Sequence, residues 1–138
     1  MTTITHLLDS SAWLAHLFRE PGNDAVSVLL LDPTARVGVA ALSIVEVHAR
    51  MCAQGIERRF LEVVDEYREL FAQIVPVDET VALRTVTIRQ SATARVPAID
   101  AMIAATAANH DAILVHRDPH FLSIPENMLK QEMLTADL

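Results

Sequence analysis

Near its beginning the chain reads Ile4-Thr5-His6-Leu7-Leu8-Asp9-Ser10-Ser11-Ala12-Trp13, a short apolar run followed by three side chains that cap helices well. The apolar run, residues 4–8, predicts a strand. The oxygens of Asp9, Ser10 and Ser11 can accept the free N–H groups at the start of a helix. We therefore predict a strand that leads directly into a helix at residues 12–18.

The rest of the chain repeats this order of short strands and longer helices. Further strands are predicted at residues 37–40, 74–77 and 112–116, with a short last strand at 132–134. Further helices are predicted at residues 24–31, from 43 to before 55, and at 57–72, 79–91 and 98–109. Such alternation, with few hairpin signals, is typical of α/β proteins. We predict one domain over residues 1–138, with a mostly parallel central sheet of four to five strands flanked by helices.

The composition excludes several partners and chemistries. Eleven Lys and Arg stand against 18 Asp and Glu, a net charge of -7, so no overall positive field would attract nucleic acid. Lys130 is the only lysine, so the chain cannot use a catalytic mechanism that depends on a lysine before residue 130. The single Cys52 cannot form an internal disulfide, and no apolar run reaches the ~18 residues that span a membrane. We expect a soluble cytoplasmic protein without a membrane partner.

Four acidic residues occupy equivalent places in this pattern. Asp9 and Asp118 each follow a predicted strand, while Glu46 and Asp100 each lie in the first turn of a predicted helix. These places share one edge of a parallel sheet, so the acids should converge there. Converging carboxylates repel one another unless a cation lies between them. Oxygen ligands without His or Cys suit Mg²⁺ or Mn²⁺, and such an ion can activate water for phosphodiester hydrolysis.

Each of these acids also has a purely structural interpretation. Asp9 can cap the first helix, and Glu46 has the spacing of a capping box with Ser43. Asp100 lies where the helix dipole favours an anion, and Asp118 precedes a proline and can belong to a turn. The four acids taken together favour the metal site.

The residues around these acids resemble those of a known family. The stretch over residues 4–13 is similar to the beginning of a PIN domain, and residues 43–47, 98–105 and 114–121 are similar to its later acidic motifs in the same order. The resemblance spans nearly the whole chain, and in size and spacing the chain most resembles VapC-type toxins of toxin–antitoxin pairs. A PIN-like fold is implied.

This resemblance also implies a function. The chain would be a Mg²⁺-dependent endoribonuclease, the toxin of a type II pair, a homodimer, and the partner of a VapB-type antitoxin that fills its groove. The implied catalytic residues are Asp9, Glu46, Asp100 and Asp118. Of these, Asp9, Asp100 and Asp118 would hold the metal, and Ser11 would hydrogen-bond within the site. One position departs from the pattern, because many members carry a further acid two residues after Asp118 and this chain has His120 there.

Two arginines are candidate ligands for RNA phosphates. Arg95 belongs to a segment, residues 80–99, that carries three arginines and no acid and leads directly into Asp100. Arg117 precedes Asp118. A guanidinium group in either place could bind a phosphate through two parallel hydrogen bonds.

Other side chains have simpler interpretations. We expect His116 and His120, in the loop after a strand, to be solvated or to contact substrate, since no cysteine lies near them to complete a zinc site. His110 suits the end of its helix through the helix dipole, and Trp13 is expected in the core.

Two alternatives stay open at this point. A non-catalytic PIN-like binding protein would share the fold without cleaving RNA. A phospho-acceptor signalling domain also places aspartates at the ends of parallel strands. It needs a lysine near the phosphorylated site and an acidic pair early in the chain, which Lys130 and the isolated Asp9 do not provide.

Overall fold

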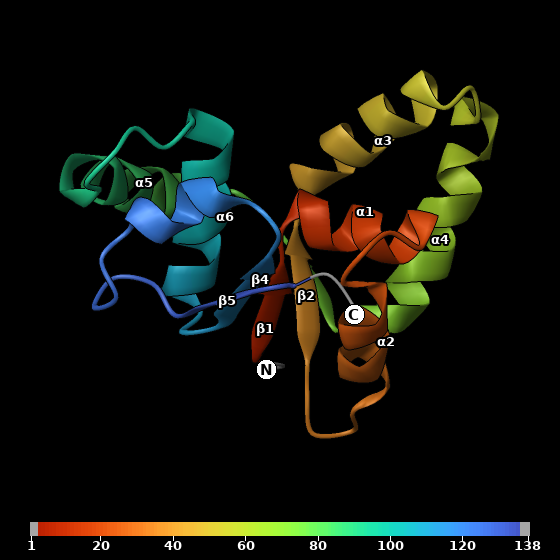
Figure 1. Ribbon diagram of the computed structural model, residues 1–138, viewed down its shortest axis with the longest axis horizontal. Coiled ribbons are helices and arrows are strands. Elements are labelled where there is room, and N and C mark those ends of the chain that lie inside the picture. Colours follow the sequence, from red (N-terminus) through yellow and green to blue (C-terminus); the bar gives the residue numbers. More distant parts are fainter. Residues whose placement is uncertain (1–2, 136–138) are drawn as a thin grey trace.

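The computed structural model describes residues 3–135 and contains a five-stranded sheet with helices on both faces (Figure 1). The strands are β1 (His6–Leu8), β2 (Val37–Ala40), β3 (Gln73–Val75), β4 (Ile113–His116) and β5 (Gln131–Met133). The α-helices are α1 (Ser10–Phe18), α2 (Asn23–Leu31), α3 (Ser43–Ala53), α4 (Phe60–Leu70), α5 (Glu79–Ser91) and α6 (Ala98–Asn109). Two short 3₁₀ helices are η1 (Glu57–Arg59) and η2 (Pro119–Ser123). These elements confirm the predicted α/β fold.

All five strands run parallel, in the order β3-β2-β1-β4-β5. β1 is central, and its Leu8 is paired with Val39 of β2 on one side and Val115 of β4 on the other. The chain adds β2 and β3 to one side of β1 before it crosses to β4 and β5 on the other side. In such sheets the carboxyl edge at the point of reversal, here between β1 and β4, is where ligands bind.

Alternate side chains of the central strands enter two separate hydrophobic cores. Leu7 and Leu114 belong to the core that α5 and α6 cover. Leu8 and Val115 belong to the core that α1, α2, α3 and α4 cover. Figure 1 shows the two groups of helices on opposite sides of the sheet. The carboxyl edge of β1 and β4 therefore lies between the two groups of helices.

The helix predicted over residues 57–72 packs one apolar face inside the chain. Trp13 is fully buried, as predicted, and its ring meets those of Tyr67 and Phe71 edge-on at 5.4 and 5.2 Å between centroids. The helix itself is shorter than predicted, because residues 57–59 form η1 and α4 begins at Phe60. A 3₁₀ turn is common at the start of an α-helix, which is why the helical pattern in the sequence begins before α4 does.

Strand boundaries differ slightly from the prediction. β3 covers Gln73–Val75 rather than residues 74–77, because Pro76 has no N–H group to continue the ladder. The last strand lies at Gln131–Met133, one residue earlier than expected, and pairs with β4. Within residues 3–135, no helix is both long and apolar enough to cross a membrane.

Candidate metal centre

Asp9 lies at the junction of β1 and α1. Its backbone N–H donates to the carbonyl of Val115 at 3.0 Å, which ties the end of β1 to β4. Its Oδ1 accepts the N–H of Ala12 at 2.8 Å and so caps α1, as predicted. The Ser11 hydroxyl donates to both oxygens of the same carboxylate, at 2.7 and 2.8 Å. Asp9 is only 4% exposed, and these hydrogen bonds hold its carboxylate in one direction.

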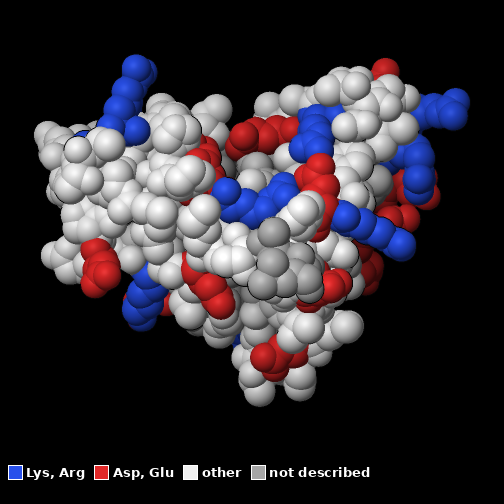
Figure 2. All heavy atoms as spheres, viewed as in Figure 1, with Lys and Arg blue, Asp and Glu red and all other residues white. Residues whose placement is uncertain are grey.

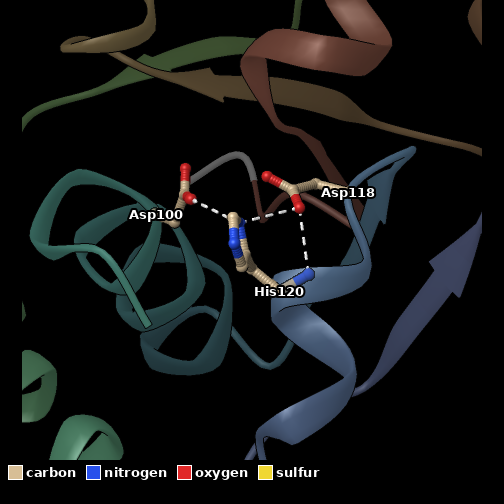
Figure 3. A group of neighbouring side chains, drawn as sticks. All are labelled: Asp100, Asp118 and His120. Atoms are coloured by element: carbon tan, nitrogen blue, oxygen red, sulfur yellow. Dashed lines mark hydrogen bonds and ion pairs between the residues drawn. The ribbon is translucent and has the colours of Figure 1, made fainter. Parts of the chain in front are cut away.

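Asp100, Asp118 and His120 form a compact group beside it (Figure 3). Asp100 lies in the first turn of α6, and Asp118 caps η2 by accepting the backbone N–H of His120 at 2.9 Å. The Nδ1 atom of His120 lies 3.0 Å from Asp118 Oδ1 and 3.7 Å from Asp100 Oδ2. One ligand atom from each of the three residues lies within 4.8 Å of the others, so the group could hold one ion.

Glu46 reaches the site from α3, with a different partner from the one predicted. Leu42 occupies the cap position in a helical conformation, so Ser43 already lies inside α3. Ser43 is buried, and its hydroxyl has no hydrogen-bond partner within residues 3–135. The Ser10 hydroxyl instead donates to Glu46 Oε1 at 2.6 Å. The capping-box interpretation is therefore wrong, and Glu46 is held by the first turn of α1.

Electrostatics connect Asp9 to the other acids. Burial is the main reason that the pKa of Asp9 is raised from 3.8 to about 7. Hydrogen bonds from Ser11 and Ala12 lower this pKa, while the charges of Asp100 and Asp118 raise it. Without a cation, the Asp9 carboxyl thus tends to keep a proton near neutral pH.

Asp100 shows the same effect. Burial first, then the charges of Asp118 and Glu46, raises the pKa of Asp100 to about 6, and His120 lowers it. Asp100 therefore lies close to Asp118 and Glu46, and its own charge reaches Asp9. A divalent cation among them would relieve the repulsion and displace the protons. The oxygen donors fit such an ion well.

The surface is hollowed at this edge. Figure 2 shows a depression between the part of the molecule formed by α5 and α6 and the part formed by α1, α3 and α4, with acidic and basic side chains gathered in it. The side chains of Asp100 and Asp118 are themselves partly exposed.

The two candidate phosphate ligands differ in their surroundings. Arg95 is exposed in the segment between α5 and α6. Arg117 donates to Glu20 Oε1 at 2.9 Å and to the Pro21 carbonyl at 3.0 Å, while its backbone N–H donates to the Ser11 hydroxyl at 2.9 Å. Its guanidinium group thus joins the end of β4 to the end of α1 and braces the site. Arg95 is the better candidate phosphate ligand.

His116 contradicts the prediction of a solvated loop residue, because it is the last residue of β4 and is fully buried. Its Nδ1 accepts the backbone N–H of Asp118 at 3.1 Å, and its Nε2 lies 2.9 Å from Gln131 Oε1. Burial lowers the pKa of His116, which favours the neutral ring. A backbone N–H can only donate, so Nδ1 is the acceptor and Nε2 carries the proton. The side chain of His120 is 56% exposed, as expected, but it also lies between two acids.

Sequence reasoning missed two residues that shape the site. Ser10 holds Glu46, whereas the sequence predicts only a capping role for it. Its place in the polar run beside Asp9 could have marked it as a residue of the site. Glu20 binds both Arg117 and Arg50. No local pattern marks Glu20, because its partners are 97 and 30 residues away along the chain.

The family model for the PIN domain matches residues 6–127 of this chain. The chain belongs to the PIN domain family. Its parallel sheet flanked by helices is the fold that the sequence resemblance led us to expect. A comparison with curated proteins finds no match.

Several solved structures share this PIN fold. VapBC2 from Rickettsia felis, bound to a DNA fragment from its promoter, gives a TM-score of 0.77 at 15% identity, covering 96% of this chain and 100% of that chain. DNA-bound VapBC from Salmonella typhimurium gives 0.74 at 21% identity, covering 94% and 98%. FitAcB from Neisseria gonorrhoeae gives 0.66 at 27% identity, covering 92% and 96%. VapBC-5 from Mycobacterium tuberculosis, described as a member of a family of toxin–antitoxin systems, also shares the fold, with a TM-score of 0.65 at 22% identity, covering 96% and 98%.

Proposed function

We propose that this PIN domain is a divalent-metal-dependent endoribonuclease and the toxin of a toxin–antitoxin pair. The observation that carries the proposal is the grouping of Asp9, Glu46, Asp100 and Asp118 at the carboxyl edge of one sheet, where burial raises the pKa of Asp9 to about 7. Buried carboxylates that repel one another cost stability, and a cation site is a sufficient reason for keeping them.

Three of the acids would bind the metal ion, and the fourth would act as general base towards the attacking water. Asp9, Asp100 and Asp118 supply the oxygen ligands for Mg²⁺ or Mn²⁺. When bound, the ion would supply an activated water and neutralise the oxygens of the scissile phosphate. Ser11 keeps the Asp9 carboxylate oriented through its two hydrogen bonds. Glu46, fixed by Ser10, would orient the attacking water and accept its proton.

RNA binding would depend on local positive charge. The chain carries a net charge of -7, so attraction must come from the ion and from nearby arginines such as Arg95. Arg95 leads into α6 and could bind a phosphate next to Asp100. Because cellular RNA lies in the cytoplasm, we propose that the protein acts there.

The decisive experiment is an RNA cleavage assay with the purified chain. Wild-type protein should cut single-stranded RNA in Mg²⁺ or Mn²⁺ and should be inactive in excess EDTA. Asp100→Asn should lower the rate by at least about 100-fold, because the ion loses a charged ligand. Asp65→Asn, the same change at an exposed acid of α4, should keep the wild-type rate.

The possible results separate the alternatives. Full activity of Asp100→Asn, or cleavage in EDTA, would contradict a metal-dependent nuclease. A wild-type chain that binds metal but cuts no RNA would point to a non-catalytic PIN-like binding protein. The phospho-acceptor alternative fails on the family assignment. A phospho-acceptor domain also needs a lysine near the acids of the site. The only lysine, Lys130, instead pairs with Asp111 just before β4, at the opposite, amino edge of the sheet.

The partners follow from the same proposal. Structural neighbours occur in complexes described as VapBC and FitAB bound to DNA, which supports a VapB-type antitoxin as the partner of this chain. An anionic cleft without metal would accept a basic side chain of that partner. We also propose that the chain forms a homodimer, since several large apolar side chains are exposed on its helices.

A further inference from the structure

His120 occupies an unusual place among the acids of the site. Its Nδ1 lies between Asp118 Oδ1, at 3.0 Å, and Asp100 Oδ2, at 3.7 Å, as Figure 3 shows. Its main chain is fixed on both sides, because its N–H donates to Asp118 Oδ1 at 2.9 Å and its carbonyl accepts the Ser123 hydroxyl at 2.9 Å. The ring is thus aimed into the site rather than placed there by a freely moving loop.

The distances suit shared ligation of one ion. Two ligand atoms that each lie about 2.1 Å from an ion are about 3.0 Å apart at a right angle and about 4.2 Å apart when opposite. Both distances from Nδ1 fall in this range. The imidazole could therefore bind the same ion as both carboxylates with little rearrangement.

We propose that His120 is a metal ligand, and that its nitrogen makes the centre bind Mn²⁺ in preference to Mg²⁺. This inference rests on the proposed metal-dependent function and adds the identity of the ion. Mg²⁺ takes oxygen ligands and gives up its waters reluctantly, whereas transition ions bind imidazole more readily. The remaining ligands are carboxylates, which suit Mn²⁺ among the transition ions.

A different role for His120 predicts the opposite effect on metal binding. A protonated imidazole between Asp100 and Asp118 would act as an internal cation that the metal must displace. Removing the ring would then strengthen the binding of both ions. If the ring is a ligand, its removal weakens binding, and the loss is larger for Mn²⁺. The sign of the change separates the two roles.

The experiment is a calorimetric titration of Mn²⁺ and of Mg²⁺ into the full chain, prepared free of metal. Wild type should bind Mn²⁺ at least tenfold more tightly than Mg²⁺. His120→Ala should lose at least tenfold in Mn²⁺ affinity and much less in Mg²⁺ affinity. His120→Asp, which gives an all-oxygen ligand set, should restore binding and shift the preference towards Mg²⁺. His48→Ala, at an exposed histidine of α3, should match wild type.

A spectroscopic measurement tests direct ligation. Pulsed electron paramagnetic resonance of Mn²⁺ bound to wild type should show coupling to a nitrogen nucleus, and this coupling should vanish in His120→Ala and His120→Asp. Unchanged coupling, equal losses for both ions, or tighter binding by His120→Ala would overturn the proposal. Because binding is read without RNA, a chain that selects Mn²⁺ but cuts no RNA would refute only the nuclease function. A nuclease without this selectivity would refute only the role of His120.

Discussion

At the scale of single residues, Asp9 combines near-complete burial with an acidic group. In the metal-free chain its pKa is about 7, whereas the ordinary value of an unfolded aspartate is 3.8. Between these pH values the folded state binds more protons than the unfolded state. The free energy of unfolding therefore falls as pH rises from about 4 to 7, because stability follows the difference in bound protons.

We predict that Asp9→Asn removes most of this decline. The amide keeps an acceptor for the Ala12 N–H but carries no charge to bury. Because one pKa unit corresponds to about 1.4 kcal/mol, the variant should gain on the order of 2–4 kcal/mol over wild type at pH 8 in EDTA. Urea denaturation at pH 5 and pH 8 measures the effect. Asp65→Asn should behave as wild type, and a wild-type chain equally stable at both pH values would refute the prediction.

At the scale of elements, a short chain of hydrogen bonds joins β4, η2 and β5. The Asp118 N–H donates to His116 Nδ1, and His116 Nε2 donates to Gln131 Oε1. Gln131 Nε2 then donates to the Phe121 carbonyl at 2.8 Å. The last strand thus holds the loop that carries the acid and the imidazole of the site. The edge strand β5 therefore both extends the sheet and positions the loop of the site.

Gln131→Ala should break this chain at its centre. The buried His116 N–H and the Phe121 carbonyl would lose their partner, which typically costs about 1–3 kcal/mol. Chemical denaturation at pH 7 measures the loss, and calorimetry should show weaker metal binding as the Asp118 loop loosens. Gln90→Ala, at an exposed position of α5, is the matched control. Stability and metal affinity equal to wild type would show that β5 does not hold the loop.

At the scale of the whole molecule, the net charge of -7 and the cluster of acids at the site favour a basic inhibitor as partner. We predict that the cognate antitoxin inserts an arginine that pairs with Asp9, Asp100 or Asp118 and competes with both metal and RNA. Changing that arginine to alanine should weaken inhibition of RNA cleavage, and added metal should oppose inhibition by the wild-type antitoxin. Inhibition that is unchanged by the substitution and insensitive to metal would place the antitoxin elsewhere.

Exposed apolar side chains on the helices could bind a second copy of the chain. The apolar face of α4, which carries Val63 and Tyr67, is buried in the core, so a dimer would use other surfaces. Leu83 and Val86 lie one turn apart on α5 and are 61% and 55% exposed. We predict a homodimer at micromolar concentration without antitoxin, measured by light scattering, and its dissociation by Leu83→Glu with Val86→Glu. Leu61→Glu on α4, where the leucine is 73% exposed, should leave it intact. A monomeric wild type would contradict the prediction.

The alternation of elements and the placement of the acids were determined by the sequence itself. Strand and helix patterns depend on near neighbours, so β1, α1 and α6 could be predicted from residues a few positions apart. Asp9, Asp100 and Asp118 follow from that pattern, since the carboxyl ends of parallel strands share one edge whatever the packing.

The partners of the side chains were decided only by the tertiary structure. Ser10 binds Glu46 across 36 residues of sequence and Arg117 binds Glu20 across 97, while the buried His116 packs on Phe121 and binds Gln131. The two side-chain pairs depend on distances and directions between elements that are far apart along the chain. A local pattern carries no information about such distances, because they are set by how the two cores pack on either face of the sheet.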